Sequence, residues 1–288
     1  MTGASRGLGR QWAVAALDRG DRVAATARDI SALADLRESY GDAVEPIELD
    51  VTDRQACFAA VRAAHDRFGR LDVVVNNAGY GQYGFVEELS EADARTQMDT
   101  NFFGALWITQ AALPYLRAQR SGHIIQVSSI GGVLAFPNLG IYHASKWALE
   151  GMSQSLAGEV EPFGVRVTLV EPGGFDTEWI TAAPHSEPLA AYDFQRTAFE
   201  SARVERRADL GRPEATRSAI LAIVDAQDPP HRVFLGRHVF DWARTEYADR
   251  LAEWERWQPL ADAAHGKVQE TTMDGMVPRG ALEANPEK

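Results

Sequence analysis

Several short apolar segments, separated by longer segments of helical periodicity, constrain the fold of this chain more than any other feature. The run Val73-Val74-Val75 has no polar interruption, which is typical of a strand covered on both faces. Because strands alternate with helices, the sequence predicts an α/β fold, a doubly wound parallel sheet with helices on both faces. We expect strands at Arg22–Ala27, Val44–Leu49, Leu71–Asn76, His123–Ser128, Val165–Val170 and Arg232–Leu235, and helices at Arg10–Arg19, Asp53–Phe68, Glu91–Arg117, Tyr142–Glu161 and Pro213–Ala226.

The length of 288 residues is within the range of one large α/β domain, which we place at residues 1–265. Residues 175–212 interrupt the alternation and predict a lid-like insertion. Residues 266–288 are polar and contain Gly and Pro, so a loose C-terminal tail is expected. Aromatic side chains of the insertion favour a mainly apolar substrate, although aromatic residues in a long loop often only pack it down. They are Trp179, Tyr192, Phe194 and Phe199.

The charge balance and cysteine content narrow the possible partners and the compartment. A net charge of −12 argues against nucleic-acid binding, which normally needs a basic surface. No apolar run is long enough for a membrane span, and the N-terminus lacks a signal-peptide pattern. Cys57 is the single cysteine, so a disulfide within the chain is impossible. We therefore expect a cytoplasmic protein with a small-molecule substrate and with neither a membrane nor a nucleic-acid partner.

A glycine-rich turn opens the chain and leads directly into the first helical segment. Glycines there would let the backbone turn tightly and approach a pyrophosphate at the helix N-terminus. The Gly-x-x-x-Gly-x-Gly spacing differs from the commoner Gly-x-Gly-x-x-Gly pattern, and alone it also fits a plain surface turn. The position of the turn before a β-α-β alternation favours a dinucleotide site. The expected contacts from this turn are Gly3, Ser5, Arg6, Gly7, Leu8 and Gly9.

Two arginines favour NADP(H) over NAD(H) as the cofactor. Arg6 lies within the glycine turn, and Arg28 follows the strand expected at Arg22–Ala27. In dinucleotide folds an acid at this strand end binds the ribose 2′-hydroxyl of NAD, whereas an arginine accommodates the 2′-phosphate of NADP. A guanidinium matches phosphate geometry well, so we predict an NADP(H) preference.

Tyr142 and Lys146 are four residues apart and share one face of a helix. Lys146 is the only lysine before residue 267, in a chain that otherwise uses arginine, which indicates a task for a compact ammonium. A nearby ammonium favours the phenolate, so we expect it to lower the pKa of Tyr142 toward the working pH. Tyr142 could then act as a general acid or base on a carbonyl or alcohol oxygen. Ser129 or Ser128 could hold that oxygen, and periodicity alone does not choose between them.

The neighbouring His143 is assigned a structural role, because successive helix residues diverge.

Together these residues resemble the short-chain dehydrogenase/reductase family over roughly Thr2–Thr177, with its Rossmann-like fold. The family's glycine motif is similar to Thr2–Gly9, and its Asn-Asn-Ala-Gly motif to Asn76, Asn77, Ala78 and Gly79. Its adenine-contacting Asp-Val pair resembles Asp50-Val51, and its helix asparagine resembles Asn101. Its catalytic Ser, Tyr and Lys match Ser129, Tyr142 and Lys146, and its spacing prefers Ser129 over Ser128. Its Pro-Gly motif with a downstream threonine resembles Pro172, Gly173 and Thr177.

The resemblance implies roles beyond those that the residues alone suggest. Lys146 would also bind the nicotinamide ribose, and Asn101 would hold a water that links Lys146 to solvent. Pro172, Gly173 and Thr177 would border the nicotinamide. The segment 170–179 resembles the hydroxysteroid and retinol dehydrogenase branch, and family members often pair as homodimers or homotetramers.

One departure from the family is the start of the chain. Family members begin with an apolar strand before the glycine turn, whereas here only Met1 precedes Thr2. That strand normally lies between the strands expected at Arg22–Ala27 and Leu71–Asn76, and its loss would leave backbone groups without partners. We therefore hypothesise that the native chain starts upstream or that this is a fragment.

Two other classes of protein compete with an oxidoreductase. A non-catalytic NADP(H)-binding sensor or regulator would use the same fold but would be expected to lack Tyr142 or Lys146. A methyltransferase would favour an acid in place of Arg28 and has no need for the Tyr-Lys pair. The sequence therefore predicts an NADP(H)-dependent oxidoreductase, and NADPH use favours carbonyl reduction.

Overall fold

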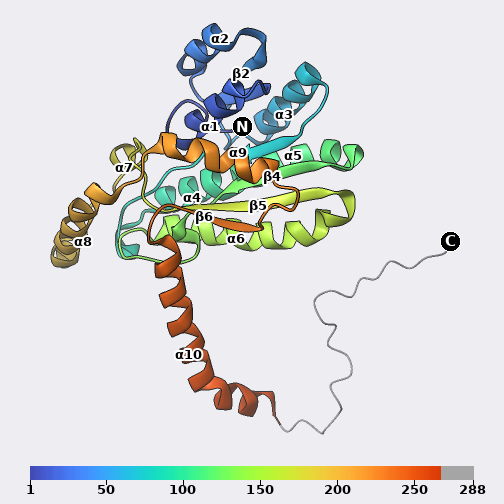
Figure 1. Ribbon diagram of the computed structural model, residues 1–288. Coiled ribbons are helices and arrows are strands. Elements are labelled where there is room, and N and C mark those ends of the chain that lie inside the picture. Colours follow the sequence, from blue (N-terminus) through green and yellow to red (C-terminus); the bar gives the residue numbers. More distant parts are fainter. Residues whose placement is uncertain (267–288) are drawn as a thin grey trace. The chain divides into compact units, whose positions relative to one another are not determined.

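A computed structural model describes residues 1–266 and divides the chain into two compact units, Met1–Ala243 and a second that begins at Arg244 (Figure 1). The sheet and all residues of the predicted site belong to the first unit. The domain predicted over residues 1–265 spans the first unit and part of the second. Residues 267–288, which form all but the first residue of the predicted tail, lie outside the described residues.

The strands are all parallel and form two sheets. One sheet has the order β1-β2, and the other has the order β3-β4-β5-β6. The register pairs Val75 of β3 with Ile125 of β4, and Ile125 with Thr168 of β5. This arrangement confirms the predicted α/β parallel fold. The strand bounds are β1 Val23–Ala27, β2 Val44–Glu48, β3 Val73–Asn76, β4 Gly122–Val127, β5 Val165–Pro172 and β6 Arg232–Leu235.

The first residues of the chain lie between β1 and β3, where the expected family strand would lie. The amide of Thr26 donates to the Met1 carbonyl at 3.0 Å, and the amide of Thr2 donates to the Val75 carbonyl at 2.9 Å. Thr26 belongs to β1 and Val75 to β3. Met1 and Thr2 therefore connect the two sheets through backbone hydrogen bonds.

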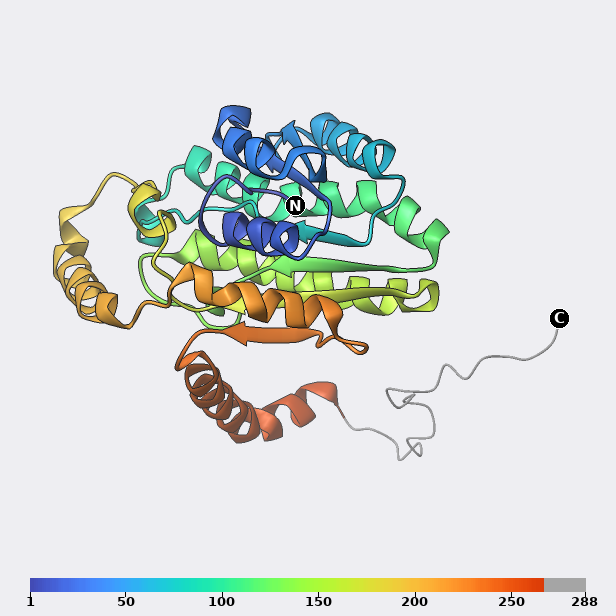
Figure 2. The same cartoon turned by 45° about the horizontal axis from the view of Figure 1, so that its top comes forward.

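Helices cover both faces of the larger sheet. Ile124 and Val167 pack in a core cluster with side chains of α3, α5 and α6, whereas Ile125 and Val170 pack with residues of α1 and α9. Neighbouring strand residues point to opposite faces, so this alternation is the expected consequence of the pleat. In Figure 2 α1 and α9 lie on the near side of the strands and α5 and α6 on the far side. The bounds are α1 Gly7–Asp18, α3 Arg54–Phe68, α5 Gly104–Gln119, α6 Gly140–Val160 and α9 Arg217–Asp225.

The helix predicted over Glu91–Arg117 is divided. The segment α4 (Glu91–Met98) is followed by a π-helical turn at Asp99–Phe103 and then by α5. Such turns are rare and frequently occur at functional sites. Asn101 lies within this one, so the irregularity falls on a residue of the predicted site.

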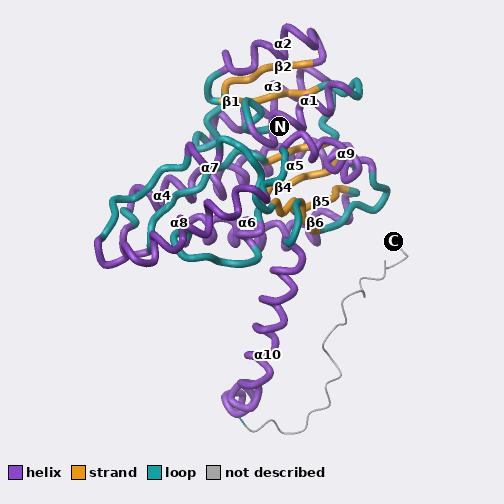
Figure 3. The backbone as a smooth tube through the Cα atoms, turned by 60° about the vertical axis from the view of Figure 1, so that its left-hand side comes forward, coloured by secondary structure: helices purple, strands orange, loops and turns teal. Residues whose placement is uncertain are grey.

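The predicted insertion contains two helices, α7 (Trp179–Ala182) and α8 (Asp193–Arg206). Its two ends meet, because the Asp176 amide donates to the Gly211 carbonyl at 2.8 Å. The side chain of Glu88 is fully buried and forms an ion pair with Arg196 of α8. Figures 1 and 3 show that α7 and α8 extend from the edge of the sheet at which the strands have their carboxyl ends.

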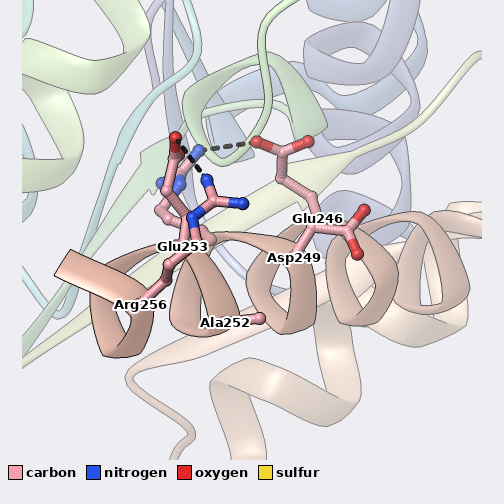
Figure 4. Close-up of a pocket in the computed structure, with 6 residues that line it drawn as sticks. Glu246, Asp249, Ala252, Glu253 and Arg256 are labelled. Carbon is pink, nitrogen blue, oxygen red and sulfur yellow. Dashed lines mark hydrogen bonds and ion pairs between the residues drawn. The ribbon is translucent and has the colours of Figure 1, made fainter.

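Two further helices were not expected from the sequence, α2 (Ala34–Tyr40) and α10 (Val239–His265). Val239 and Ala243 in the first turns of α10 are buried. Further along, Figure 4 shows a hollow on the helix surface, where Arg250 pairs with Glu246 at 2.9 Å and Arg256 with Glu253 at 3.7 Å. Because this hollow is formed by one helix alone, we assign no site to it. Among residues 1–266 no helix combines the length and apolar character that crossing a membrane requires.

Candidate active site

Ser129 and Tyr142 meet at the carboxyl end of β4. Ser129 is the second residue after β4, and Tyr142 lies in the first turn of α6. The two side chains form a hydrogen bond, and Ser129 Oγ also accepts the Gly131 amide at 3.0 Å. Ser128 instead lies beside Glu150, on the other side of the strand. Of the two serines that periodicity left open, Ser129 is thus the one that contacts Tyr142, and its role in holding a substrate oxygen stays a prediction.

The pKa of Tyr142 moves in the opposite direction to the one expected from the sequence. Burial raises the pKa of Tyr142 to about 12, and the hydrogen bond with Ser129 offsets this only in part. Lys146 Nζ lies 6.0 Å from the centre of the Tyr142 ring. The expected lowering by a neighbouring ammonium is thus wrong for this structure, because desolvation of the phenolate outweighs any such effect.

Lys146 is buried on the inner face of α6, and its ammonium donates to the Val127 carbonyl at 2.8 Å. Burial lowers the pKa of Lys146 to about 8, and the charge of Glu150 acts in the opposite direction. If Gly79 carried a side chain, its Cβ would lie 3.5 Å from Lys146 Nζ and 3.1 Å from Asn101 Oδ1, so both groups lie directly beside this glycine. The Asn-Asn-Ala-Gly loop, Asn101 and Lys146 are therefore neighbours.

Asn101 holds the loop that follows Gly79. Its Nδ2 donates to the Tyr80 carbonyl at 2.9 Å and to Ser145 Oγ at 3.0 Å, and its Oδ1 accepts the Tyr80 amide at 3.0 Å. Its side chain is thus bonded to the loop and to α6. The water relay that the family resemblance implies for Asn101 stays a prediction.

The glycine turn packs against the end of β3. Asn77 Nδ2 donates to the carbonyls of Thr2 at 3.1 Å and Gly3 at 2.9 Å. A Cβ on Gly9 would lie 2.3 Å from both the Gly3 carbonyl oxygen and Asn77 Nδ2, and one on Gly3 would lie 3.0 Å from the backbone of Ala78. Only glycine fits at position 9, since the backbone there approaches Gly3 too closely for any side chain.

The first turn of α1 can receive an anion. No side chain caps the helix at Arg6, and its first turn contains no acid. Gly7 has φ +56°, which favours glycine, and a Cβ there would lie 3.7 Å from Thr177. Unpaired N–H groups at such a terminus suit a phosphate. The half-buried Ser5 and Leu8 belong to the same turn.

The two predicted arginines differ in their surroundings. Arg6 is exposed and forms an ion pair with Glu178 at 3.2 Å, beyond the Pro-Gly motif. Arg28 is exposed at the end of β1.

The predicted cofactor contacts at the ends of β2 and β3 differ in their burial. Asn76 points into the core, where Nδ2 donates to Thr109 Oγ1 and Gln126 Oε1, both at 3.0 Å, so its amide joins β3 to α5 and β4. Asp50 is exposed after β2 and accepts the Thr52 amide at 2.9 Å. Val51 is buried.

The Pro-Gly motif ends β5 beside Ser129. Pro172 is the last residue of the strand, and its carbonyl accepts from Ser129 Oγ at 3.5 Å. The Gly173 amide donates to the Leu235 carbonyl at 2.8 Å, which fixes the chain against β6. The motif is thus close to the predicted catalytic serine.

Aromatic side chains of the insertion surround Tyr142. The ring of Trp179 lies 5.2 Å from that of Tyr142 and 6.3 Å from that of Tyr83, and Phe199 lies 6.2 Å from Tyr83. Sequence analysis did not identify Tyr83, because no motif marks its position. Phe194, by contrast, is 83% exposed and takes no part in this cluster.

Two other aromatic residues have structural roles. Tyr192 stacks on Phe85 at 4.8 Å and donates to Glu87 at 2.7 Å, so it packs the insertion down. His143 Nε2 accepts the Phe136 amide at 3.0 Å, and its Nδ1 lies 2.9 Å from the Gly131 carbonyl. Both ring nitrogens of His143 are therefore used by the backbone, in agreement with the structural role expected for it.

The chain belongs to the short chain dehydrogenase family, whose pattern matches residues 1–187. It is 38% identical over 239 residues to the 3-ketodihydrosphingosine reductase of Bacteroides thetaiotaomicron, covering 82% of this chain and 86% of that protein.

Two solved structures extend the comparison. A short-chain dehydrogenase from Streptomyces avermitilis is 38% identical, with a TM-score of 0.83, and the match covers 91% of this chain and 97% of that one. A short chain dehydrogenase from Burkholderia cenocepacia in complex with NADP is 30% identical, with a TM-score of 0.70 and coverage of 88% and 94%. The protein is therefore an oxidoreductase of this family, and its structural relatives support a nicotinamide cofactor.

Replacement of Gly9 by alanine should lower the free energy of unfolding by about 1–3 kcal/mol, because the new methyl group would overlap backbone at Gly3. Urea unfolding followed by circular dichroism would measure this. Gly158→Ala is the matched control, since a Cβ there meets nothing within 4 Å and should stabilise α6 by up to about 1 kcal/mol. Equal stability of the two variants would contradict the close packing of the turn.

Proposed function

We propose that this protein is an NADP(H)-dependent reductase of an apolar ketone or aldehyde, with Tyr142 as the proton donor. The observation that carries the proposal is the buried Tyr142 hydroxyl, hydrogen-bonded to Ser129 and enclosed by Trp179. When bound, the cofactor supplies the hydride. A carbonyl oxygen between Ser129 and Tyr142 would then receive its proton from the phenol.

The raised pKa of Tyr142 favours reduction over oxidation. A phenol whose pKa is about 12 keeps its proton throughout the physiological range, so the populated form of Tyr142 is the protonated one that carbonyl reduction requires. As negative charge develops on the substrate oxygen, the proton of Tyr142 neutralises it. The Ser129 hydroxyl would hold the same oxygen in place.

The residues present fit a nicotinamide dinucleotide. The uncapped first turn of α1 would hold the pyrophosphate, with Gly3, Gly7 and Gly9 allowing its approach. Lys146, next to Gly79, would bind the nicotinamide ribose. Further contacts are expected from Asp50, Val51, Asn77, Ala78, Pro172, Gly173 and Thr177, whereas the inward direction of Asn76 favours a supporting role for it.

An NADP(H) preference is supported by the absence of an acid at the end of β1, where Arg28 is exposed. Arg6 can contribute if it exchanges Glu178 for a phosphate, since exposed ion pairs are weak. A guanidinium forms two parallel hydrogen bonds with phosphate, so either residue suits the 2′-phosphate.

An apolar substrate is supported by the rings around Tyr142. Trp179, Tyr83 and Phe199 present aromatic surface beside the proton donor. The 3-ketodihydrosphingosine reductase relative is named for a ketone. The resemblance of segment 170–179 to hydroxysteroid and retinol dehydrogenases, the homodimer or homotetramer and the cytoplasmic location stay predictions.

Tyr142→Phe should reduce the rate of NADPH-dependent ketone reduction by about 10²–10⁴-fold, because it removes the proton donor and leaves the ring in place. NADPH binding, followed by nicotinamide fluorescence, should be retained. Tyr115→Phe, in α5 and outside the site, is the control. If the wild-type protein bound NADPH but reduced no ketone or aldehyde, a non-catalytic NADP(H) sensor would be favoured instead.

Arg28→Ala should weaken NADPH binding about tenfold or more and leave NADH binding unchanged, since only NADPH has a 2′-phosphate. Fluorescence titrations with both cofactors would measure the ratio of the two affinities. Arg62→Ala removes an exposed arginine from α3 and serves as the control. A parallel loss of affinity for both cofactors would contradict recognition of the 2′-phosphate.

Trp179→Ala should raise the KM for long-chain or cyclic ketones about tenfold, because it removes aromatic surface beside Tyr142. Steady-state kinetics over a panel of ketones of increasing apolar size would test this. Phe194→Ala, which removes an exposed ring from the same insertion, should change KM by about twofold at most. Similar effects of the two variants would exclude a specific role for Trp179.

A further inference from the structure

A pair of buried carboxyl groups lies one helical turn beyond Lys146. Glu150 is four residues after Lys146 on the inner face of α6, and Glu171 is on β5. They are 7% and 1% exposed. No catalytic or cofactor-binding role was predicted for either residue, although Glu171 lies within the segment 170–179, and the proposed proton transfer from Tyr142 does not use them.

One arginine serves both carboxyl groups. Arg232 Nε lies 3.2 Å from Glu150 Oε2 and 3.6 Å from Glu171 Oε1. Its side chain is 38% exposed, so it connects the pair to solvent at the edge strand β6. One positive charge therefore faces two buried carboxyl groups, and burying a second uncompensated carboxylate is costly.

A proton on one of the two carboxyl groups would balance the charge, because the pair would then carry one negative charge opposite the one positive charge of Arg232. Oε1 of Glu150 and Oε1 of Glu171 are buried and receive no donor from the protein. Because a single arginine lies beside the two buried carboxyl groups, ionisation of both would leave one carboxylate uncompensated, so one of them holds a proton. Burial raises the pKa of both carboxyl groups, and with the added charge of Glu150 it raises that of Glu171 to about 8. The hydrogen bond from Arg232 Nε to Glu150 Oε2 at 3.2 Å favours the ionised form of Glu150. At neutral pH Glu171 thus holds the proton and Glu150 the charge.

The packing around Glu150 restricts the position of its buried side chain. A Cβ on Gly132 would lie 3.0 Å from Glu150 Cγ and 2.5 Å from Ser128 Oγ, so a side chain there would displace both residues. The charged or titratable groups facing Glu150 are Lys146 on its own helix, Glu171 on β5, Arg232 on β6 and His231 just before it. Of these, Lys146 is the one next to the proposed proton donor.

We propose that Glu150 is a positioning residue that keeps the buried Lys146 in its ammonium form, and that Glu171 sustains this by holding the proton the pair shares. The attraction between Glu150 and Lys146 offsets the desolvation of the ammonium, whose pKa is already lowered to about 8 by burial. Without Glu150, Lys146 would lose its proton at a lower pH. The consequence for catalysis, though not for the charge of Lys146, rests on the proposed function.

The charge of Lys146 can be followed directly by NMR, because the chain contains only three lysines. Protein labelled with ¹³C at lysine Cε would be titrated with pH, and Lys146→Arg would assign the signal. We expect a wild-type midpoint near 8 and a midpoint about 1 lower in Glu150→Gln. Glu171→Gln, which keeps the carboxylate of Glu150, should leave it near the wild-type value. Glu159→Gln removes an exposed charge from the same helix and is the matched control.

An unchanged Lys146 midpoint in a folded Glu150→Gln protein would overturn the inference, as would an equal decrease in Glu159→Gln. The double variant with glutamine at both Glu150 and Glu171, which removes both carboxyl groups, should lower the midpoint at least as far as Glu150→Gln. In turnover, the alkaline limit of kcat/KM should move downward with the NMR midpoint. Failure of the wild-type protein to turn over would contradict the proposed function but leave the NMR result interpretable.

Discussion

The hydrogen bonds between the first residues of the chain and the end of β3 determine the geometry of the site. Thr2 Oγ1 accepts the amides of Asn77 and Ala78, each at 3.0 Å, while Asn77 Nδ2 donates to the Gly3 carbonyl at 2.9 Å. These contacts join the two sheets and set the position of the N-terminus of α1. The same loop continues to Gly79, beside Asn101 and Lys146. The proposed cofactor cradle and the proposed proton donor are therefore placed by one short segment.

Burial acts in opposite directions on the acids and bases of the site. It raises the pKa of Tyr142 to about 12 and that of Glu171 to about 8, and it lowers the pKa of Lys146 to about 8. In each case the uncharged form gains, because a low-dielectric interior disfavours charge. The spacing of Tyr142 and Lys146 shows that they share a helix face. It does not show how deeply they are buried, and for that reason the pKa expected for Tyr142 from sequence was wrong.

The strands and the helices that cover them could be predicted from sequence, whereas the helices of the insertion and the π-helical turn could not. The strand expected at Val165–Val170 lies within β5, which is buried at every residue except Arg166, since apolar runs record burial on both faces. The helix α8 depends on distant contacts, among them the ion pair of Arg196 with Glu88, more than a hundred residues away. The π-helical turn likewise depends on Asn101, which bonds to Tyr80 and Ser145. Such long-range bonds leave no periodic pattern in the sequence.

The motif residues of the site were also predictable, but the groups that set their charges were not. Strand alternation places Ser129 next to Tyr142 and Ser128 next to Glu150, so the end of β4 contacts both the proton donor and the carboxyl pair. On α6, Tyr142, Lys146 and Glu150 follow at intervals of four and form one buried row. A charge at one end of this row acts on the next residue through an interior that screens weakly. The protonation of Lys146 therefore has to be understood together with Glu150 and Glu171, for which the sequence predicted no role.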